Sequence, residues 1–365
     1  MSVLTFAPLL SAIMQIGRTP GQVPWQVLLR TTGYSLRPPS PRPYAARNTT
    51  RQQPLLESGA CGLHQRAEIL CEERFGPIPT IVIGGFVPDA TEAAYLLRGT
   101  LLRQGSVLYV NYPRRGFSID LFVAQIDDLV TELATLRGRP PVVIAVSFGA
   151  GIVLEWLRRA ADAGRMPALS GLVLVSPVAC AADLLAPGSA KPTTLLGRAL
   201  KPYLQVDSVL DDAQVEKSRM LFLRMFEAGS KNLAAVRRIM APSECRLLRD
   251  RVLGNINAVD TRGAVERVGA LRDLPPLRDP RPLHTAPTLV LYAEKEGSVL
   301  CEDAPTMREL TTRPAAWFPT GRTEVLKNTP ENPVQHASLI FHSPNFRPAL
   351  AGFYRSLRQK RRQAA

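Results

Sequence analysis

A short apolar run changes into small residues within a few positions, and this change restricts the fold more than any other stretch. Residues 141–146 read PVVIAV, a β-branched run typical of a parallel strand buried on both faces. The segment after Gly151 keeps helical spacing through Leu154, Leu157 and Arg158. Ser147 therefore lies at a sharp strand-to-helix corner. Ala145 and Gly149, two positions before and after it, are small enough for the two elements to approach closely.

This corner resembles the Gly-x-Ser-x-Gly signature of the α/β-hydrolase family, with Ala145 in place of the first glycine. It lacks both the Gly-x-Gly-x-x-Gly spacing and the lysine of phosphate-binding turns. The resemblance implies a nucleophile elbow with Ser147 as the nucleophile. The alternative is a buried serine in an ordinary strand-to-helix turn.

Alternating strand and helix patterns predict an α/β fold, namely the α/β-hydrolase fold with a mostly parallel sheet and helices on both faces. The interval between the last two strong strand runs is too long for one crossover, and it contains several stretches of helical spacing. We expect strands near 80–83, 106–112, 142–146, 169–176 and 286–293, and helices in the interval near 195–204, 215–226, 233–240 and 264–271.

Composition divides the chain into a leader, a core and an insertion. Residues 1–61 are rich in proline and arginine, so we expect a disordered basic leader. Residues 62–178 and 287–365 are assigned to the hydrolase core, and residues 179–286 to a helical cap or lid.

The last part of the chain has weaker patterns than the core. There we expect a helix near 304–310, a strand at 315–318 and a closing helix near 348–358.

A serine hydroxyl needs a base to activate it, and the base needs an acid to orient it. In the family the order along the chain is serine, acid, histidine. Glu296, at the end of a late strand, occupies the place where family members usually carry an aspartate, and Asp183 after the preceding strand is the reserve acid. His336 follows both and is the expected base, with His342 as the weaker alternative. The competing interpretations are a surface carboxylate and a structural histidine.

Acyl transfer also requires backbone N–H groups that stabilise an oxyanion. In this family one donor follows the nucleophile and the other follows the early strand. The resemblance assigns these donors to Phe148 and Phe86, the latter in an Ile-Gly-Gly-Phe stretch similar to the family's His-Gly-x motif. The alternative for this stretch is an ordinary glycine turn.

The charge balance does not point to nucleic acid. The chain has 45 basic and 31 acidic residues, a net charge of +14, but the basic residues are spread along it. The dense run at 355–362 lacks the interleaved aromatic residues of a single-strand binding surface. We therefore expect no nucleic-acid partner, and nothing in the sequence supports peripheral membrane contact.

Cysteine and histidine are too few and too scattered for a metal centre. The five cysteines show no paired spacing, and there are four histidines, so we expect no metal, no cofactor and no disulfide framework. Thiols without such a framework favour a cytoplasmic protein, with export through the leader as the alternative.

The residues together predict a serine hydrolase that cleaves a carboxylic ester or related small acyl substrate through a Ser-His-Glu triad and a covalent acyl-enzyme. Two alternatives stay open: a non-catalytic interaction protein with the same fold, and an acyltransferase or thioesterase with the same triad. Candidates for an acyl pocket in the insertion, which could equally pack between cap and core, are Met220, Leu221, Leu223, Met225 and Phe226.

Overall fold

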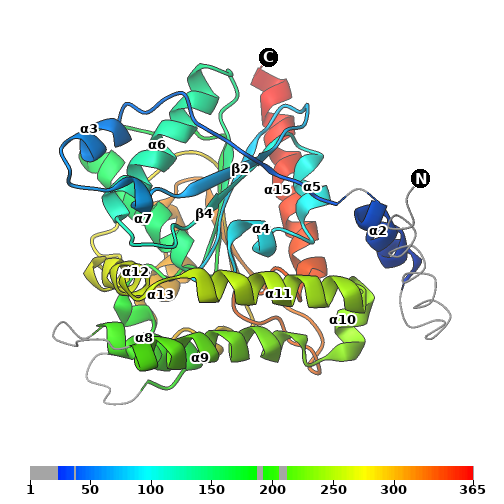
Figure 1. Cartoon of the computed structure of the whole chain (residues 1–365). Coiled ribbons are helices and arrows are strands. Elements are labelled where there is room, and N and C mark those ends of the chain that lie inside the picture. Colours follow the sequence, from blue (N-terminus) through cyan, green and yellow to red (C-terminus); the bar gives the residue numbers. More distant parts are fainter. Residues whose placement is uncertain (1–23, 37, 187–191, 205–211, 365) are drawn as a thin grey trace.

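The computed structural model describes residues 24–36, 38–186, 192–204 and 212–364 of the 365-residue chain. An eight-stranded sheet with the order β1-β2-β4-β3-β5-β6-β7-β8 runs through the molecule (Figure 1). Its strands are β1 (Arg42–Pro43), β2 (Glu68–Glu72), β3 (Thr80–Ile83), β4 (Val107–Asn111), β5 (Val142–Val146), β6 (Gly171–Val175), β7 (Thr288–Ala293) and β8 (Gly321–Leu326).

The sheet is parallel from β4 to β8 and antiparallel at its other edge. β3, β4, β5, β6, β7 and β8 pair in parallel, whereas β2 pairs antiparallel with β4 and β1 pairs antiparallel with β2. The central strands are buried along their whole length, which explains their continuous apolar runs. The fold class predicted from the sequence is confirmed.

Helices cover both faces of this sheet (Figure 1). Neighbouring residues of a strand point to opposite faces, so Ile83 packs with α6 (Ile119–Thr135) and α7 (Phe148–Asp162). Val82 packs on the other side with α5 (Arg98–Leu102) and α15 (Ser343–Ala364). The remaining helices of the core are α4 (Ala90–Ala93), α13 (Pro305–Thr312) and α14 (Pro314–Trp317).

The interval between β6 and β7 is helical. Figure 1 shows two of its helices, α9 and α11, running side by side across one end of the sheet. α11 was not expected, because Leu248, Val252 and Ile256 form only a narrow buried stripe on an otherwise polar helix. The helices of the interval are α8 (Leu195–Leu204), α9 (Asp212–Ser230), α10 (Leu233–Ile239), α11 (Pro242–Ala258) and α12 (Thr261–Asp273).

The expectation of a disordered leader through residue 61 was wrong for the part that the structure describes. Residues 24–61 contain α2 (Trp25–Leu36), β1 and α3 (Gln52–Glu57), while residues 1–23 lie outside the described residues. The composition argument considered only apolar burial. Backbone hydrogen bonds to buried carboxylates hold this segment instead.

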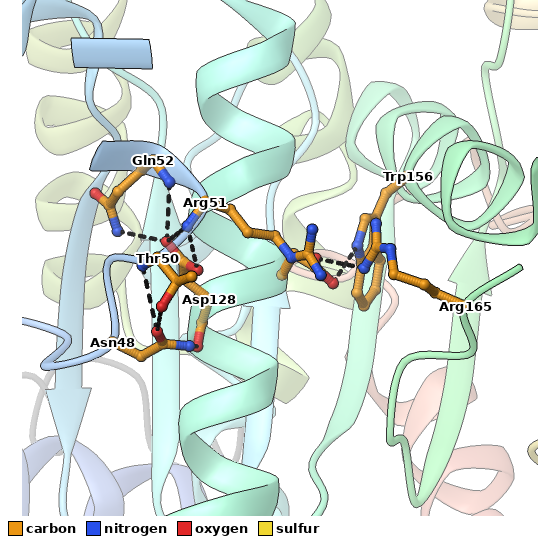
Figure 2. Close-up of polar contacts among 8 residues, drawn as sticks. Asn48, Thr50, Arg51, Gln52, Asp128, Trp156 and Arg165 are labelled. Carbon is orange, nitrogen blue, oxygen red and sulfur yellow. Dashed lines mark hydrogen bonds and ion pairs between the residues drawn. The ribbon is translucent and has the colours of Figure 1, made fainter. Parts of the chain in front are cut away.

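Two carboxylates on α6 accept these hydrogen bonds. Asp128 accepts from the backbone N–H groups of Arg51 at 3.0 Å and Gln52 at 3.1 Å (Figure 2). Glu132, one turn further on, accepts from the backbone N–H of Asn48 at 3.0 Å and from the Tyr44 hydroxyl. The segment before β2 is therefore fixed to the core by charge-assisted hydrogen bonds.

The strand expected at 315–318 was also wrong. Residues 314–317 form α14, because Pro314 suits the first position of a helix, and the last strand is β8. β8 is a half-exposed edge strand with polar residues such as Arg322 and Glu324, so it lacks the apolar run of its neighbours. Across the described residues, no helix is long and apolar enough to span a membrane.

Candidate active site

Ser147 occupies the corner between β5 and α7. Its φ of 51° and ψ of −116° are unusual for a residue other than glycine, and its N–H donates to the Val175 carbonyl at 2.8 Å. Gly149 is required there, since a Cβ at this position would lie 2.3 Å from the Gly84 carbonyl oxygen. Close packing on the β3 loop thus forces the turn that presents the Ser147 side chain.

His336 lies within hydrogen-bond distance of Ser147. Its Nε2 is 3.0 Å from Ser147 Oγ, and its Nδ1 bonds to Glu296 Oε2. A proton on Nδ1, donated to the carboxylate, leaves Nε2 free to accept the serine proton. The structure therefore brings Ser147, His336 and Glu296 together in one hydrogen-bonded row, from three segments far apart in the sequence.

Glu296 is positioned by a serine that the sequence reasoning missed. Its Oε1 accepts from the Ala293 N–H at 2.6 Å and from Ser176 Oγ at 2.7 Å. Ser176 Oγ in turn accepts from the N–H of Ala337, next to His336, at 3.1 Å. Ser176 directly follows β6, the neighbour of β5 and β7, and this place at the carboxyl end of a central strand was the only available signal.

The two reserve residues lie elsewhere. Asp183 is fully buried and accepts from the backbone N–H groups of Ala179 at 2.8 Å and Thr306 at 2.9 Å; burial raises the pKa of its carboxyl group, although these hydrogen bonds act in the opposite direction. It bonds to no histidine within the described segments. His342 Nδ1 lies 2.9 Å from the Ser338 hydroxyl, and among the described residues neither Asp183 nor His342 hydrogen-bonds to Ser147, His336 or Glu296.

The loop after β3 passes directly over Ser147. A Cβ added to Gly85 would lie 3.3 Å from the Ser147 Cβ. The backbone N–H groups of Phe86 and Phe148 have no hydrogen-bond acceptor among the described residues. The rings of these two residues stack with centroids 4.1 Å apart. Both N–H groups are thus available beside the serine.

A cavity of about 430 Å³ opens onto Ser147 and His336. Met225 and Phe226 line it, as two of the candidates from the insertion, together with Phe222 from the same helix. Met220, Leu221 and Leu223 do not line it, and Met220 is exposed. The final loop contributes further apolar walls through Leu339, Ile340 and Phe341.

The described residues contain no group of three or more histidine, cysteine or acidic side chains that could hold a metal ion. All five cysteines are among them, and all are free thiols.

A profile described as "Alpha/beta hydrolase family" matches residues 81–350, which is most of the chain. The chain belongs to the alpha/beta hydrolase family. The family resemblance drawn from the elbow is confirmed. A comparison with curated protein sequences found no match.

Solved structures of two esterases and an epoxide hydrolase share the fold. An esterase from Exiguobacterium antarcticum is 16% identical with a TM-score of 0.56, covering 79% of this chain and 96% of its own. An esterase from Thermogutta terrifontis is 17% identical with a TM-score of 0.52, covering 80% and 94%. An epoxide hydrolase from Bacillus megaterium is 12% identical with a TM-score of 0.51, covering 79% and 96%. At these identities the likeness shows the fold, and the chemistry must be argued from this chain's own site.

Proposed function

We propose that this protein is a serine hydrolase that cleaves carboxylic esters or closely related acyl compounds. The observation that carries the proposal is the 3.0 Å contact between Ser147 Oγ and His336 Nε2, with Glu296 on the other ring nitrogen. A hydroxyl, an imidazole and a carboxylate in this order are the groups that nucleophilic acyl transfer requires.

In the proposed reaction Ser147 Oγ attacks the carbonyl carbon while His336 Nε2 takes the hydroxyl proton. The carbonyl oxygen becomes an oxyanion and accepts hydrogen bonds from the Phe86 and Phe148 N–H groups. His336 gives its proton to the leaving alkoxide, which departs as an alcohol and leaves an ester on Ser147. A water molecule then loses a proton to His336, attacks this acyl-enzyme, and releases the carboxylic acid as the proton returns to Ser147.

The cavity supports an acyl or alkyl substituent of moderate size. Its volume of about 430 Å³ falls within the usual range for small-molecule sites, and its walls are largely aromatic and aliphatic. Glu296 is buried and stays beside His336, where a negative charge stabilises the imidazolium that forms during attack.

Labelling with a fluorophosphonate probe tests the nucleophile. We expect the wild type to be labelled, and Ser147→Ala to lose both labelling and about 10⁴-fold or more of ester turnover. Ser356→Ala is the matched control, because Ser356 donates to a carbonyl within α15 at 2.7 Å and does not line the cavity. Unchanged labelling of Ser147→Ala would contradict the assignment.

Labelling, combined with assays of ester hydrolysis and acyl transfer, distinguishes the alternative functions. A folded wild type that is neither labelled nor active on acyl esters of graded length would favour a non-catalytic protein. Labelling with acyl transfer to an added alcohol or thiol in preference to water would favour an acyltransferase.

A further inference from the structure

A second, smaller cavity adjoins the one at Ser147. It has a volume of about 60 Å³, and three of its lining residues, Phe86, Val87 and Phe222, also line the larger cavity. A volume of this size holds about two water-sized groups, enough for a carboxylate. Its other walls come from α8, α9, α11 and α12.

Arg267 of α12 lines this cavity, and no carboxylate of the described residues forms an ion pair with it. Its side chain is only 4% exposed, and its Nη2 donates to the Pro113 carbonyl at 2.8 Å. Its guanidinium carbon lies 4.8 Å from the centre of the Tyr112 ring. Its Nε has no hydrogen-bond partner, and within the described residues it forms no ion pair. Burial lowers the pKa of Arg267 to about 10, so the group stays charged at neutral pH.

A second guanidinium lines the same cavity from α9. Arg219 donates to the Val259 carbonyl at 2.6 Å, and its buried Nε also has no partner. Its ion pair with Glu216, at 3.2 Å, lies at the surface, where such pairs contribute little. Two arginines, each with a buried Nε that lacks a hydrogen-bond partner, therefore line one largely apolar space.

The acidic group that acts electrostatically on Arg267 is already paired with another arginine. Asp89 is the carboxylate that acts on it electrostatically, but Asp89 is already ion-paired with Arg114, which also bonds to Asn255. One carboxylate thus provides the only negative charge that these described contacts give to two guanidinium groups. Arginine is rarely fully buried unless it is paired, so an uncompensated buried guanidinium at a cavity wall indicates a ligand charge.

We propose that this cavity binds a carboxylate, or an anionic group of similar size, at the end of the substrate remote from the bond that is cleaved. The proposal rests on the ester hydrolysis proposed above. The substrate extends from Ser147 past Phe86 and Phe222, and its anionic end accepts hydrogen bonds from Arg267 and Arg219. The preferred substrates are then monoesters of dicarboxylic acids or esters with a comparable remote anion.

The competing role for Arg267 is structural, because its hydrogen bond to Pro113 joins α12 to the loop after β4. A structural role predicts a loss of stability on substitution with no change in the relative affinity for charged and neutral ligands. A binding role predicts a change in that ratio.

Calorimetric titration with simple acids distinguishes the two roles. The probes are linear dicarboxylates of four to eight carbons, each compared with the monocarboxylate of the same length. We expect wild type and Ser147→Ala to bind at least one dicarboxylate about 10-fold or more tightly than its partner. Arg267→Met should lose this preference, and Arg267→Lys should retain part of it because the charge remains.

Arg272→Met is the matched control on the same helix, since Arg272 pairs at the surface with Asp273 and lines neither cavity. It should bind both acids as the wild type does. Equal affinity of the wild type for every pair of acids would overturn the proposal, and so would an unchanged preference in Arg267→Met. If Arg267→Met does not fold, Arg267→Lys and Arg219→Met decide, and an unchanged preference in both would overturn it. A dicarboxylate preference in a protein without ester turnover would leave the anion site intact and refute only the esterase function.

Discussion

Two buried carboxylates follow neighbouring strands, and their hydrogen-bond partners separate their roles. Glu296 uses one oxygen for Ser176 and the Ala293 N–H and directs the other at His336. The oxygens of Asp183 accept hydrogen bonds from backbone N–H groups, two in the loop after β6 and one in α13. Only Glu296 is placed to orient an imidazole, so the two acids should respond differently to loss of charge.

Neutralising each acid in turn tests this difference. Glu296→Gln should keep the fold and lower kcat by about 10³-fold to 10⁴-fold, because a neutral amide no longer stabilises the imidazolium. Asp183→Asn should retain most activity per folded molecule but lose about 1–3 kcal/mol of unfolding free energy, since an amide group would face backbone N–H donors. Steady-state kinetics and urea unfolding measure the two effects. The reverse pattern would assign the acid to Asp183.

Ser176 offers a test of positioning. Ser176→Ala removes one of the two hydrogen bonds to Glu296 Oε1 and the acceptor for the Ala337 N–H. We expect kcat to fall about 10-fold with KM unchanged, because this serine does not line the substrate cavity. Ser170→Ala, before the other end of β6, removes only a bond to the Pro140 carbonyl and is the control. Equal kcat in both variants would exclude a positioning role.

At the scale of elements, the site depends on how closely α7 and the loop after β3 approach each other. Gly149 in the first turn of α7 touches Gly84, and Gly85 in the loop touches Ser147. The same loop carries Phe86, whose ring stacks on Phe148 of α7. The serine and both proposed oxyanion donors therefore move together if either element shifts.

Gly149→Ala should disturb this arrangement. The added methyl would meet the Gly84 carbonyl oxygen at 2.3 Å, so the loop must move, at a cost of about 1–3 kcal/mol in unfolding free energy and with a loss of kcat. Gly352→Ala in α15 is the control: a Cβ there meets nothing within 4 Å, and the helix should gain about 0.5–1 kcal/mol. Wild-type activity in Gly149→Ala would show that the close approach is not needed.

At the scale of the whole molecule, the N-terminal segment is part of the folded unit. Asp128 on α6 holds Arg51 and Gln52 (Figure 2). Glu132 on the same helix holds Tyr44, and β1 extends the sheet at its antiparallel edge. Ser147 and Glu296 follow the carboxyl ends of the parallel strands β5 and β7, and none of the contacts that hold residues 44–52 involves them. Loss of the segment should therefore lower stability without changing the chemistry.

Asp128→Ala tests the contribution of this segment. It leaves two backbone N–H groups, those of Arg51 and Gln52, without an acceptor, so we expect a loss of about 2–3 kcal/mol in urea unfolding and faster tryptic cleavage at Arg51, with kcat unchanged. Asp120→Ala on the same helix removes only an exposed ion pair with Arg159 and should change stability little. Similar stability of the two variants would show that the segment contributes little to the fold.

The sequence by itself determined the elements whose signal is local. Buried parallel strands give continuous apolar runs, and the corner at Ser147 needs small neighbours, so the sheet, the elbow and the chain order of serine, acid and histidine could all be predicted. The half-exposed β8, the narrow stripe of α11 and the polar N-terminal segment gave weak or misleading patterns, because their stability comes from partners elsewhere in the chain.

Only the tertiary structure showed that Glu296, and not Asp183, bonds to His336, revealed Ser176, and placed Arg267 at a cavity wall. Each of these depends on contacts across long sequence separations, such as the 40 residues between Glu296 and His336 and the 154 between Pro113 and Arg267. No local sequence pattern indicates contacts between residues so far apart in the chain. These contacts follow from the packing of α12 on the loop after β4 and from the neighbouring carboxyl ends of β5, β6 and β7.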